Sequence, residues 1–349
     1  MEMSFRWYGE LDKVKLENIK QIPCMEGIVT ALYDVPVGEV WPVEKIQKLK
    51  ETVEASGLRL SVIESVPVHE EIKLGTENAQ KYIDNYKQTI RNLGQAGIDT
   101  VCYNFMPVFD WTRTEMEFVL PDGSTGLRYE QETIDKFDIE NNDLSLPGWD
   151  VSYTRDELND LIGKYQKISH EMLWENLQKF LEEVIPVAIE AEVKLAIHPD
   201  DPPWDMFGIP RIITNEQALE RVTKIVDSPY NGITFCTGSL GANSENDLPA
   251  MIRSLLKKNR INFVHARNIA LLGEKAFQEV AHPSKYGNVD MYEIIKALVE
   301  GGYEGPIRPD HGRMIWGEAG NYGYGLYDRA LGAVYLKGLE EAIIKDDKK

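Results

Sequence analysis

Four residues that can bind a transition metal end short apolar segments in the C-terminal half of the chain. His198 ends KLAIH, Cys236 ends GITFC, His265 ends INFVH and Asp310 ends GPIRPD. They are separated by 38, 29 and 45 residues, and each interval suits one strand, one helix and their loops. Two imidazoles, a thiolate and a carboxylate favour Mn, Fe, Co or Zn over Ca or Mg. The pattern therefore predicts a metal site.

Each of these residues alone also has an ordinary structural role. A lone histidine at a strand end usually makes a hydrogen bond, a cysteine within GITFC is usually a small buried apolar group, and Asp310 can cap a turn. Four such residues at equivalent positions favour the metal site. The other histidines, His69, His170 and His282, lie in charged or helical contexts, so we expect them at the surface.

Groups that transfer protons are expected beside the metal. His311 adjoins Asp310, and Gly312 allows a sharp turn that lets both side chains face one cavity. An imidazole, with an ordinary pKa of about 6.5, suits general acid–base catalysis. The downstream segment GNYGYGLYDR offers three tyrosines on a glycine-rich loop, Tyr322, Tyr324 and Tyr327. A tyrosine there either exchanges a proton or packs beneath the loop.

Several residues near strand ends are candidate substrate contacts. Arg267 and Arg308 point to the same strand faces as His265 and Asp310, so they either hold an anionic substrate or form structural pairs with carboxylates. The ends of the first and fourth predicted strands add further candidates: Arg6, Trp7, Tyr8, Asn104 and residues 110–113.

Eight strand-like segments position these residues. They span 4–8, 28–33, 58–64, 100–105, 194–198, 232–236, 261–265 and 305–308, and helical patterns lie between them. This alternation predicts an α/β fold, the (β/α)8 TIM barrel, in which the carboxyl ends of the strands converge on one active site. A doubly wound open sheet is disfavoured because the chain has no GxGxxG or GxxxxGK[ST] motif.

One connection is much longer than ordinary barrel loops. After the fourth predicted strand, residues 106–169 form a polar and aromatic stretch, which we interpret as an insertion on the C-terminal face. It acts either as an active-site lid or as an oligomer contact. We expect residues 1–349 to form a single barrel domain that includes this insertion.

Composition excludes several classes of partner. The formal net charge is −19, from 57 acidic and 38 basic residues, and such a chain repels nucleic acid. Three scattered cysteines indicate a reducing compartment rather than a disulfide framework. The charged N-terminus is unlike a secretory signal, and no apolar run reaches about 18 residues, the length of a membrane span. We expect a cytoplasmic protein without membrane partners.

Six motifs in order carry a resemblance to a known family. They are MEMSFRWYG, AIHPDDPP, FCTGSLG, FVHARN, RPDHG and YGLYDRALG, and they extend over almost the whole chain. Together they resemble the mannonate dehydratase family, metal-dependent TIM-barrel hydro-lyases of hexuronate (glucuronate) catabolism.

The resemblance implies a reaction and a set of roles. The expected reaction is dehydration of D-mannonate, a small sugar acid, to 2-keto-3-deoxy-D-gluconate with Mn²⁺ or Fe²⁺. The metal ligands of the family fall on His198, Cys236, His265 and Asp310. The catalytic pair falls on His311 and Tyr324, with Tyr322 as the neighbouring alternative. A homo-oligomer, a dimer or larger, is also expected.

Two alternative functions remain. A metal-dependent sugar isomerase or epimerase on the same barrel needs a second carboxylate or a lysine near the metal, and Glu64 is a candidate. A sugar-acid-binding barrel without activity is the other alternative, and the presence of His311 with all four ligands disfavours it.

Overall fold

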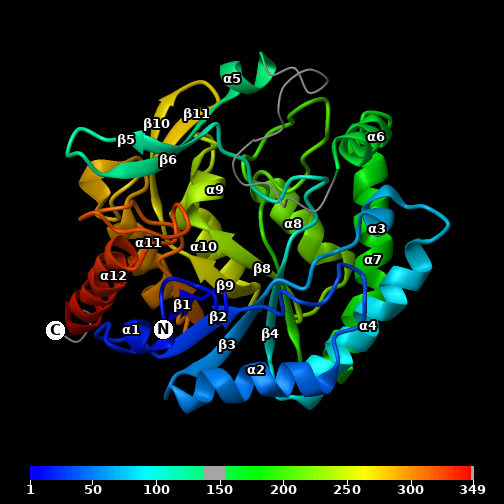
Figure 1. The fold of residues 1–349 in the computed structure, drawn as a ribbon, viewed down its shortest axis with the longest axis horizontal. Coiled ribbons are helices and arrows are strands. Elements are labelled where there is room, and N and C mark those ends of the chain that lie inside the picture. Colours follow the sequence, from blue (N-terminus) through cyan, green and yellow to red (C-terminus); the bar gives the residue numbers. More distant parts are fainter. Residues whose placement is uncertain (137–153, 347–349) are drawn as a thin grey trace.

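The structure, a computed structural model, describes residues 1–136 and 154–346. Eight parallel strands close into a barrel surrounded by helices, which confirms the predicted TIM barrel (Figure 1). In order around the barrel the strands are β1 (Glu2–Arg6), β12 (Pro306–Arg308), β9 (Ile261–His265), β8 (Asn231–Cys236), β7 (Lys194–Ile197), β4 (Thr100–Tyr103), β3 (Arg59–Glu64) and β2 (Gly27–Thr30).

All eight predicted strand segments overlap a barrel strand, and they differ from it mainly at the ends. The second was predicted over 28–33, whereas β2 covers Gly27–Thr30. Apolar residues continue past its end, as in Ala31 and Leu32. Apolar patterning marks burial, which extends into the loop, whereas backbone pairing stops earlier.

The helices pack their apolar faces against the barrel. In α10 the apolar residues spaced by three and four positions, which are Leu248, Met251, Ile252 and Leu255, are all buried. The same holds for Met291, Ile294, Ile295 and Leu298 of α11. The helices of more than five residues are α2 (Val43–Ala55), α4 (Ala79–Gln95), α6 (Arg155–Tyr165), α7 (His170–Glu190), α8 (Glu216–Ile225), α10 (Leu248–Lys257), α11 (Met291–Glu300) and α12 (Tyr327–Asp346). The shorter ones are α1 (Leu16–Lys20), α3 (Glu70–Leu74), α5 (Gln131–Asp135) and α9 (Thr237–Gly241), with a 3₁₀ turn at Ser284–Tyr286.

A second, antiparallel sheet of four strands was not predicted. Its order is β10 (Asn268–Gly273), β11 (Ala276–Val280), β6 (Thr125–Glu130) and β5 (Glu115–Val119). It joins the hairpin that follows β9 to two strands of the predicted insertion, and it lies above the barrel in Figure 1. Residues 137–153 of that insertion lie outside the described residues.

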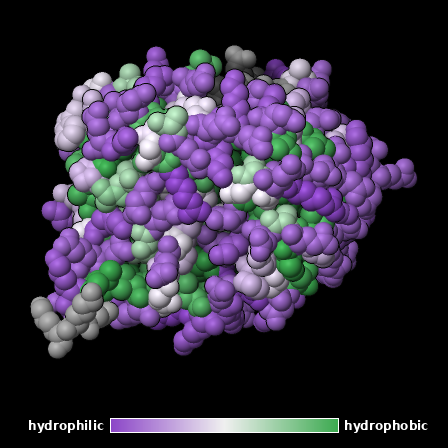
Figure 2. Space-filling view, turned by 90° about the horizontal axis from the view of Figure 1, so that it is seen from below, coloured by the Kyte–Doolittle hydropathy of each residue, from purple (hydrophilic) through white to green (hydrophobic). Residues whose placement is uncertain are grey.

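The barrel interior is filled below the predicted site. Five buried side chains from five strands form a separate apolar cluster there: Val29, Val62, Cys102, Ala196 and Phe263. Because this packing fills the interior, a site in the barrel must lie at the end where the carboxyl ends of the strands meet. The molecular face in Figure 2 is mainly hydrophilic, with hydrophobic residues in small separate patches. Among the described residues, no helix has the length and apolar character needed to cross a membrane.

Candidate metal centre and active site

Four neighbouring barrel strands bring the predicted metal ligands together. His198 follows β7 directly, Cys236 ends β8, His265 ends β9 and Asp310 lies two residues after β12. The imidazole nitrogens His198 Nε2 and His265 Nδ1 lie 3.2 Å apart. Asp310 completes the group, with Oδ2 3.6 Å from Cys236 Sγ and Oδ1 3.7 Å from His265 Nδ1.

The hydrogen bonds of these ligands suit a divalent transition metal. His198 Nδ1 lies 2.6 Å from the carbonyl oxygen of Pro199, which can only accept, so Nδ1 carries the proton and Nε2 directs a lone pair at the centre. Ser239 donates both its backbone N–H and its hydroxyl to Cys236 Sγ, which fixes the position of the sulfur beside the other ligands. One ligand atom from each of His198, Cys236 and His265 lies within 4.8 Å of the others. The donor set therefore fits a metal of the Mn, Fe or Zn type.

The backbone at Asp310 explains how two consecutive side chains face one site. Asp310 has a φ of 56°, in the left-handed region, which reverses the strand alternation before His311. The prediction that Gly312 makes this turn is wrong, because the left-handed residue is Asp310. A Cβ at Gly312 would lie 3.0 Å from Arg329 Cγ and 3.1 Å from its backbone nitrogen, so this glycine permits a close approach of α12.

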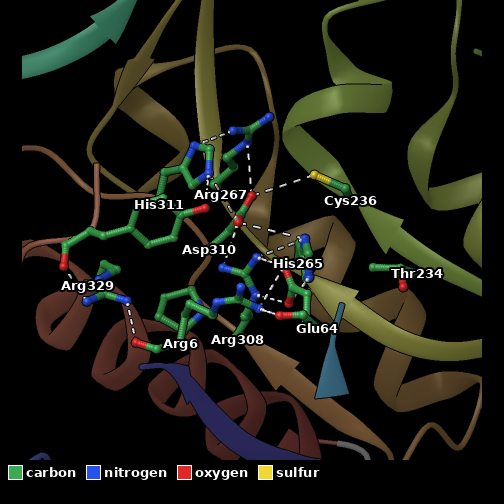
Figure 3. Close-up of polar contacts among 12 residues, drawn as sticks. Arg6, Glu64, Thr234, Cys236, His265, Arg267, Arg308, Asp310, His311 and Arg329 are labelled. Atoms are coloured by element: carbon green, nitrogen blue, oxygen red, sulfur yellow. Dashed lines mark hydrogen bonds and ion pairs between the residues drawn. The ribbon is translucent and has the colours of Figure 1, made fainter. Parts of the chain in front are cut away.

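Asp310 lies at the centre of the charged cluster (Figure 3). Arg308 Nη1 lies 2.7 Å from Oδ1, and Arg267 Nε lies 3.2 Å from Oδ2. Burial raises the pKa of Asp310, but His311, Arg308 and Arg267 outweigh it and hold this pKa well below its usual range. The carboxylate is therefore ionised and available as a ligand.

His311 and Tyr324 form a buried pair beside the ligand group. His311 Nε2 lies 2.8 Å from the Tyr324 hydroxyl and 3.7 Å from Asp310 Oδ1. Burial raises the pKa of the Tyr324 phenol well above its ordinary value, so the hydroxyl is protonated at neutral pH. Tyr322 is 39% exposed and points elsewhere, toward Glu117. The geometry therefore favours Tyr324 over Tyr322 as the partner of His311.

Arg329 anchors the loop that carries Tyr324. This buried guanidinium donates to the carbonyl oxygens of Gly325, Arg6 and Tyr324, with 2.6 Å to the first and 3.0 Å to the second. Its position over the Phe5 ring adds a cation–π contact. Because it joins the end of β1 to the tyrosine loop, Arg329 fixes where the phenol lies.

Two acidic residues that the sequence analysis did not single out complete the site. Asp201 and Glu279 are each 2% exposed, and both bind Arg267 and Arg113. Asp201 lies within the motif HPDDPP, whose two acidic residues beside His198 were the available signal. Glu279 lies on β11 of the unpredicted sheet, so no local pattern pointed to it.

The predicted substrate contacts include arginines in ion pairs, an asparagine bound to the backbone and a tryptophan whose indole N–H makes no hydrogen bond to the described residues. Arg308 forms a two-point pair with Glu64 at 2.8 and 3.2 Å, and Arg6 also lies against Glu64. Asn104 is half-buried and accepts from the backbone N–H of Met106. Trp7 is 3% exposed, and its indole N–H makes no hydrogen bond within the described part of the chain. Their substrate contacts stay predictions.

The predicted insertion reaches the site through its first residues. The Trp111 ring lies 5.4 Å from the His311 ring, centroid to centroid, and Arg113 binds Asp201 through two nitrogens at 2.9 and 3.0 Å. Residues of the insertion thus form part of the wall around His311.

The prediction for one of the remaining histidines was wrong. His282 is 2% exposed, and its Nε2 lies 2.7 Å from the Pro309 carbonyl oxygen, just before Asp310. The charged sequence around it indicated the surface, but the β11 hairpin folds it under β12. His170 is exposed beside Asp205, as predicted, and His69 is partly buried where it caps α3.

Comparisons with known proteins identify the family of the chain. The family D-mannonate dehydratase (UxuA) matches residues 1–349. A mannonate dehydratase of Streptococcus uberis is 61% identical over 348 residues, which cover 100% of both chains. The crystal structure of mannonate dehydratase from Streptococcus suis serotype 2 superposes with a TM-score of 0.94 at 51% identity, covering 100% of this chain and 96% of that one.

Another solved structure shares much less with the chain. A xylose isomerase domain protein from Planctomyces limnophilus has a TM-score of 0.56 and 14% identity, covering 98% of each chain, which shows a common fold alone. By the full-length match and the 61% identity, the chain belongs to the D-mannonate dehydratase family.

Proposed function

We propose that the chain dehydrates D-mannonate to 2-keto-3-deoxy-D-gluconate and water, as a metal-dependent hydro-lyase of hexuronate catabolism. The observation that carries the proposal is the group of four donor side chains on adjacent strands beside the His311–Tyr324 pair. Family membership and the names of the full-length relatives support the choice of substrate.

The metal of the proposal is Mn²⁺ or Fe²⁺, held by His198, Cys236, His265 and Asp310. When bound, such an ion acts as a Lewis acid that stabilises the negative charge developing on the substrate carboxylate. The thiolate among the ligands argues against a purely oxygen-liganded Mg²⁺ or Ca²⁺ site.

The two proton transfers are assigned to His311 and Tyr324. The proton at C2, next to the carboxylate, is weakly acidic and needs a general base. The hydroxyl at C3 is a poor leaving group and needs a proton as it departs. The 2.8 Å contact between the imidazole and the phenol supports a division of these roles within the pair.

Buried charges around the site suit an anionic substrate. The arginines at the site are Arg6, Arg113, Arg267, Arg308 and Arg329, and the facing carboxylates are Glu64, Asp201, Glu279 and Asp310. The Cys236 thiolate of the proposal would offset the fifth arginine, so a divalent cation held by the four ligands would supply the net positive charge. The local field therefore opposes the overall charge of −19 and favours a sugar acid.

Two further parts of the proposal concern the protein in the cell. We place it in the cytoplasm, where three free cysteines stay reduced. We also propose a homo-oligomer, a dimer or larger, with residues 106–169 as either a lid or a subunit contact.

Chelation and product analysis test the function. The protein is purified, its metal content measured, and D-mannonate supplied before chelation, after chelation and after Mn²⁺ restoration. We expect a 2-keto-3-deoxy acid that has lost one water, with activity lost and then restored. An isomerised product of unchanged mass contradicts dehydration, and activity indifferent to chelation contradicts the metal.

A further inference from the structure

A cavity of about 390 Å³ opens on the outer side of Tyr8. Two loops form its wall: the first loop, residues 8–13, follows β1, and the second loop, residues 320–323, precedes α12. The lining residues are Tyr8, Leu11, Asp12, Lys13, Gly320 and Asn321. The volume falls within the range of about 300–1,000 Å³ that is typical of small-molecule sites. None of the four metal-ligand candidates lines this cavity, so it is separate from the site described above.

One side chain stands between this cavity and the His311–Tyr324 pair. Tyr8 forms part of the cavity wall, and its ring packs edge-on against Tyr324 with the centroids 4.9 Å apart. The Tyr324 hydroxyl lies 2.8 Å from His311 Nε2, and both of these side chains are buried. A ligand in the cavity therefore reaches the pair once Tyr8 moves aside.

The two loops are anchored separately, so they can move apart. In the first loop, the Asp12 carboxylate accepts from the backbone N–H of Tyr8 at 2.9 Å. At the second loop, the backbone N–H of Tyr324 donates to the carbonyl oxygen of Asn321 at 2.9 Å. Within the described part of the chain, no backbone hydrogen bond joins one loop to the other. Opening therefore disturbs the ring packing of Tyr8 and leaves the backbone hydrogen bonds intact.

Lys13 gives this cavity a positive charge. Its side chain is exposed and, among the described residues, makes no ion pair. The other charged residue of the wall, Asp12, is buried, and both of its carboxylate oxygens accept backbone N–H groups. Because the whole chain carries a net charge of −19, most of its surface repels an anion. An unpaired ammonium group marks a place where a small carboxylate can approach.

We propose that this cavity is the entry site of the sugar acid. Lys13 meets the substrate carboxylate, the two loops part, and Tyr8 moves aside to admit the substrate to His311 and Tyr324. The inference rests on the proposed function, which supplies the substrate class. When Tyr8 returns to Tyr324 it excludes water from the pair, as loop closure does in many enzymes.

A reversible covalent lock tests whether the loops must part. A Cβ at Gly320 would lie 3.7 Å from Lys13 Cβ, close to the mean separation of about 3.8 Å in disulfides. Gly320 does not have a positive φ, so its backbone accepts a cysteine without strain. Lys13→Cys combined with Gly320→Cys should therefore form a disulfide on oxidation, and this disulfide fastens one loop to the other.

The metal-loaded double variant is assayed on D-mannonate after oxidation and again after reduction. We expect oxidation to lower kcat/KM by at least about tenfold and reduction to reverse the loss, because a locked entrance blocks both entry and release. Wild type and the single variant Gly320→Cys receive the same treatment. Thiol titration and metal content show whether the candidate ligand Cys236 has stayed reduced. A disulfide that forms fully and leaves kcat/KM unchanged overturns the proposal and assigns entry to another side of the site.

Salt dependence tests the role of Lys13. Lys13→Gln should lower kcat/KM about threefold at low ionic strength, mainly through KM, and the difference should fade in about 0.5 M salt because ions screen a surface charge. Lys15→Gln is the matched control, since Lys15 is exposed nearby but donates to the Glu10 carbonyl oxygen and does not line the cavity. Equal effects of the two substitutions contradict the role of Lys13.

A probe that does not depend on D-mannonate separates failure of this inference from failure of the proposed function. Dipicolinate, a small dicarboxylate chelator, is added to the Mn²⁺-loaded double variant, and the rate of metal loss is compared between the oxidised and reduced states. If the wild-type protein does not dehydrate D-mannonate, the proposed function fails, and slower metal loss in the oxidised state still supports the route. If the wild-type protein is active and the lock changes neither rate, only the route fails.

Discussion

The Tyr324 hydroxyl and His311 Nε2 lie 2.8 Å apart, and both side chains are buried. The two residues come from different segments, since His311 follows β12 and Tyr324 lies in the loop before α12. Tyr8 packs edge-on against Tyr324, with ring centroids 4.9 Å apart, and Arg329 donates a hydrogen bond to the Tyr324 carbonyl oxygen. This loop therefore places one phenol, and not its neighbours, at the imidazole.

Tyr324→Phe removes the hydroxyl at His311 and should lower kcat by about 10²-fold, because a general acid or base contributes at least that factor. Tyr322→Phe is the matched control, since Tyr322 is 39% exposed, and it should keep kcat within about twofold. Steady-state assays on D-mannonate with both metal-loaded variants make the comparison. The reverse order of effects would assign the proton transfer to Tyr322.

Cys236→Ser replaces a soft thiolate ligand by a hydroxyl and should weaken metal binding at least about tenfold. Loss of a residue that only hydrogen-bonds to a metal ligand already lowers metal affinity by about tenfold or more, so loss of a ligand itself should cost at least as much. Metal content after dialysis and a titration with Mn²⁺ measure the change without any activity assay. Cys24→Ser is the control, because Cys24 lies away from the site with its Sγ 4.0 Å from the Ala333 carbonyl oxygen. Equal metal content in both variants would remove Cys236 from the ligand set.

Arg308→Met should destabilise the metal-free protein by about 3 kcal/mol, because it leaves Glu64 and Asp310 buried without their shared cation. Arg59→Met removes an exposed arginine that pairs with Glu2 and Asp99, and it should cost less than about 1 kcal/mol. Urea unfolding of both variants provides the test. A loss at Arg308 no larger than that at Arg59 would show that the buried pair is structurally dispensable.

Acid should remove the stabilisation that Glu279 provides. Burial raises the pKa of Glu279, but His311, Arg267 and Arg113 outweigh it and hold this pKa at about 2, against 4.5 ordinarily. A carboxyl group with a lowered pKa stabilises the fold fully above pH 4.5 and loses this effect as the pH falls toward 2.

Unfolding at several pH values tests this sign. The difference in free energy of unfolding between wild type and Glu279→Gln should shrink by about 1 kcal/mol when the pH falls from 4.5 to about 3.5. The metal-free proteins are compared, with exposed Glu115→Gln as the control for general acid effects. A difference that grows in acid contradicts the lowered pKa.

The convergence of the four ligand candidates was predictable because each lies at a strand end. In a parallel barrel, equivalent positions of adjacent strands meet at one end, so His198, Cys236, His265 and Asp310 required no knowledge of loop structure. The choice between Tyr322 and Tyr324 was not predictable in this way. Both lie among glycines, and only the packing of the loop against Tyr8 and Arg329 distinguishes them.

The ion-pair partners of the site depended on contacts between distant segments. Glu279, in the sheet that joins a hairpin to an insertion, lies 32 residues from His311 in the chain, and Arg113 lies 166 residues from Glu279. No periodicity links such positions. The same reason explains His282, which a charged local sequence placed at the surface and the β11 hairpin buries.

Sequence alone determined the alternation of strands and helices and the residues at the strand ends, because the spacing of apolar residues and the length of each strand are local properties of the chain. It also contained the six motifs that mark the family. Tertiary structure alone decided which nitrogen of His311 meets Glu279 and which meets Tyr324, and that Arg308 pairs with Glu64 and Asp310. These choices depend on the direction of side chains within a few ångströms, which only the packed barrel defines.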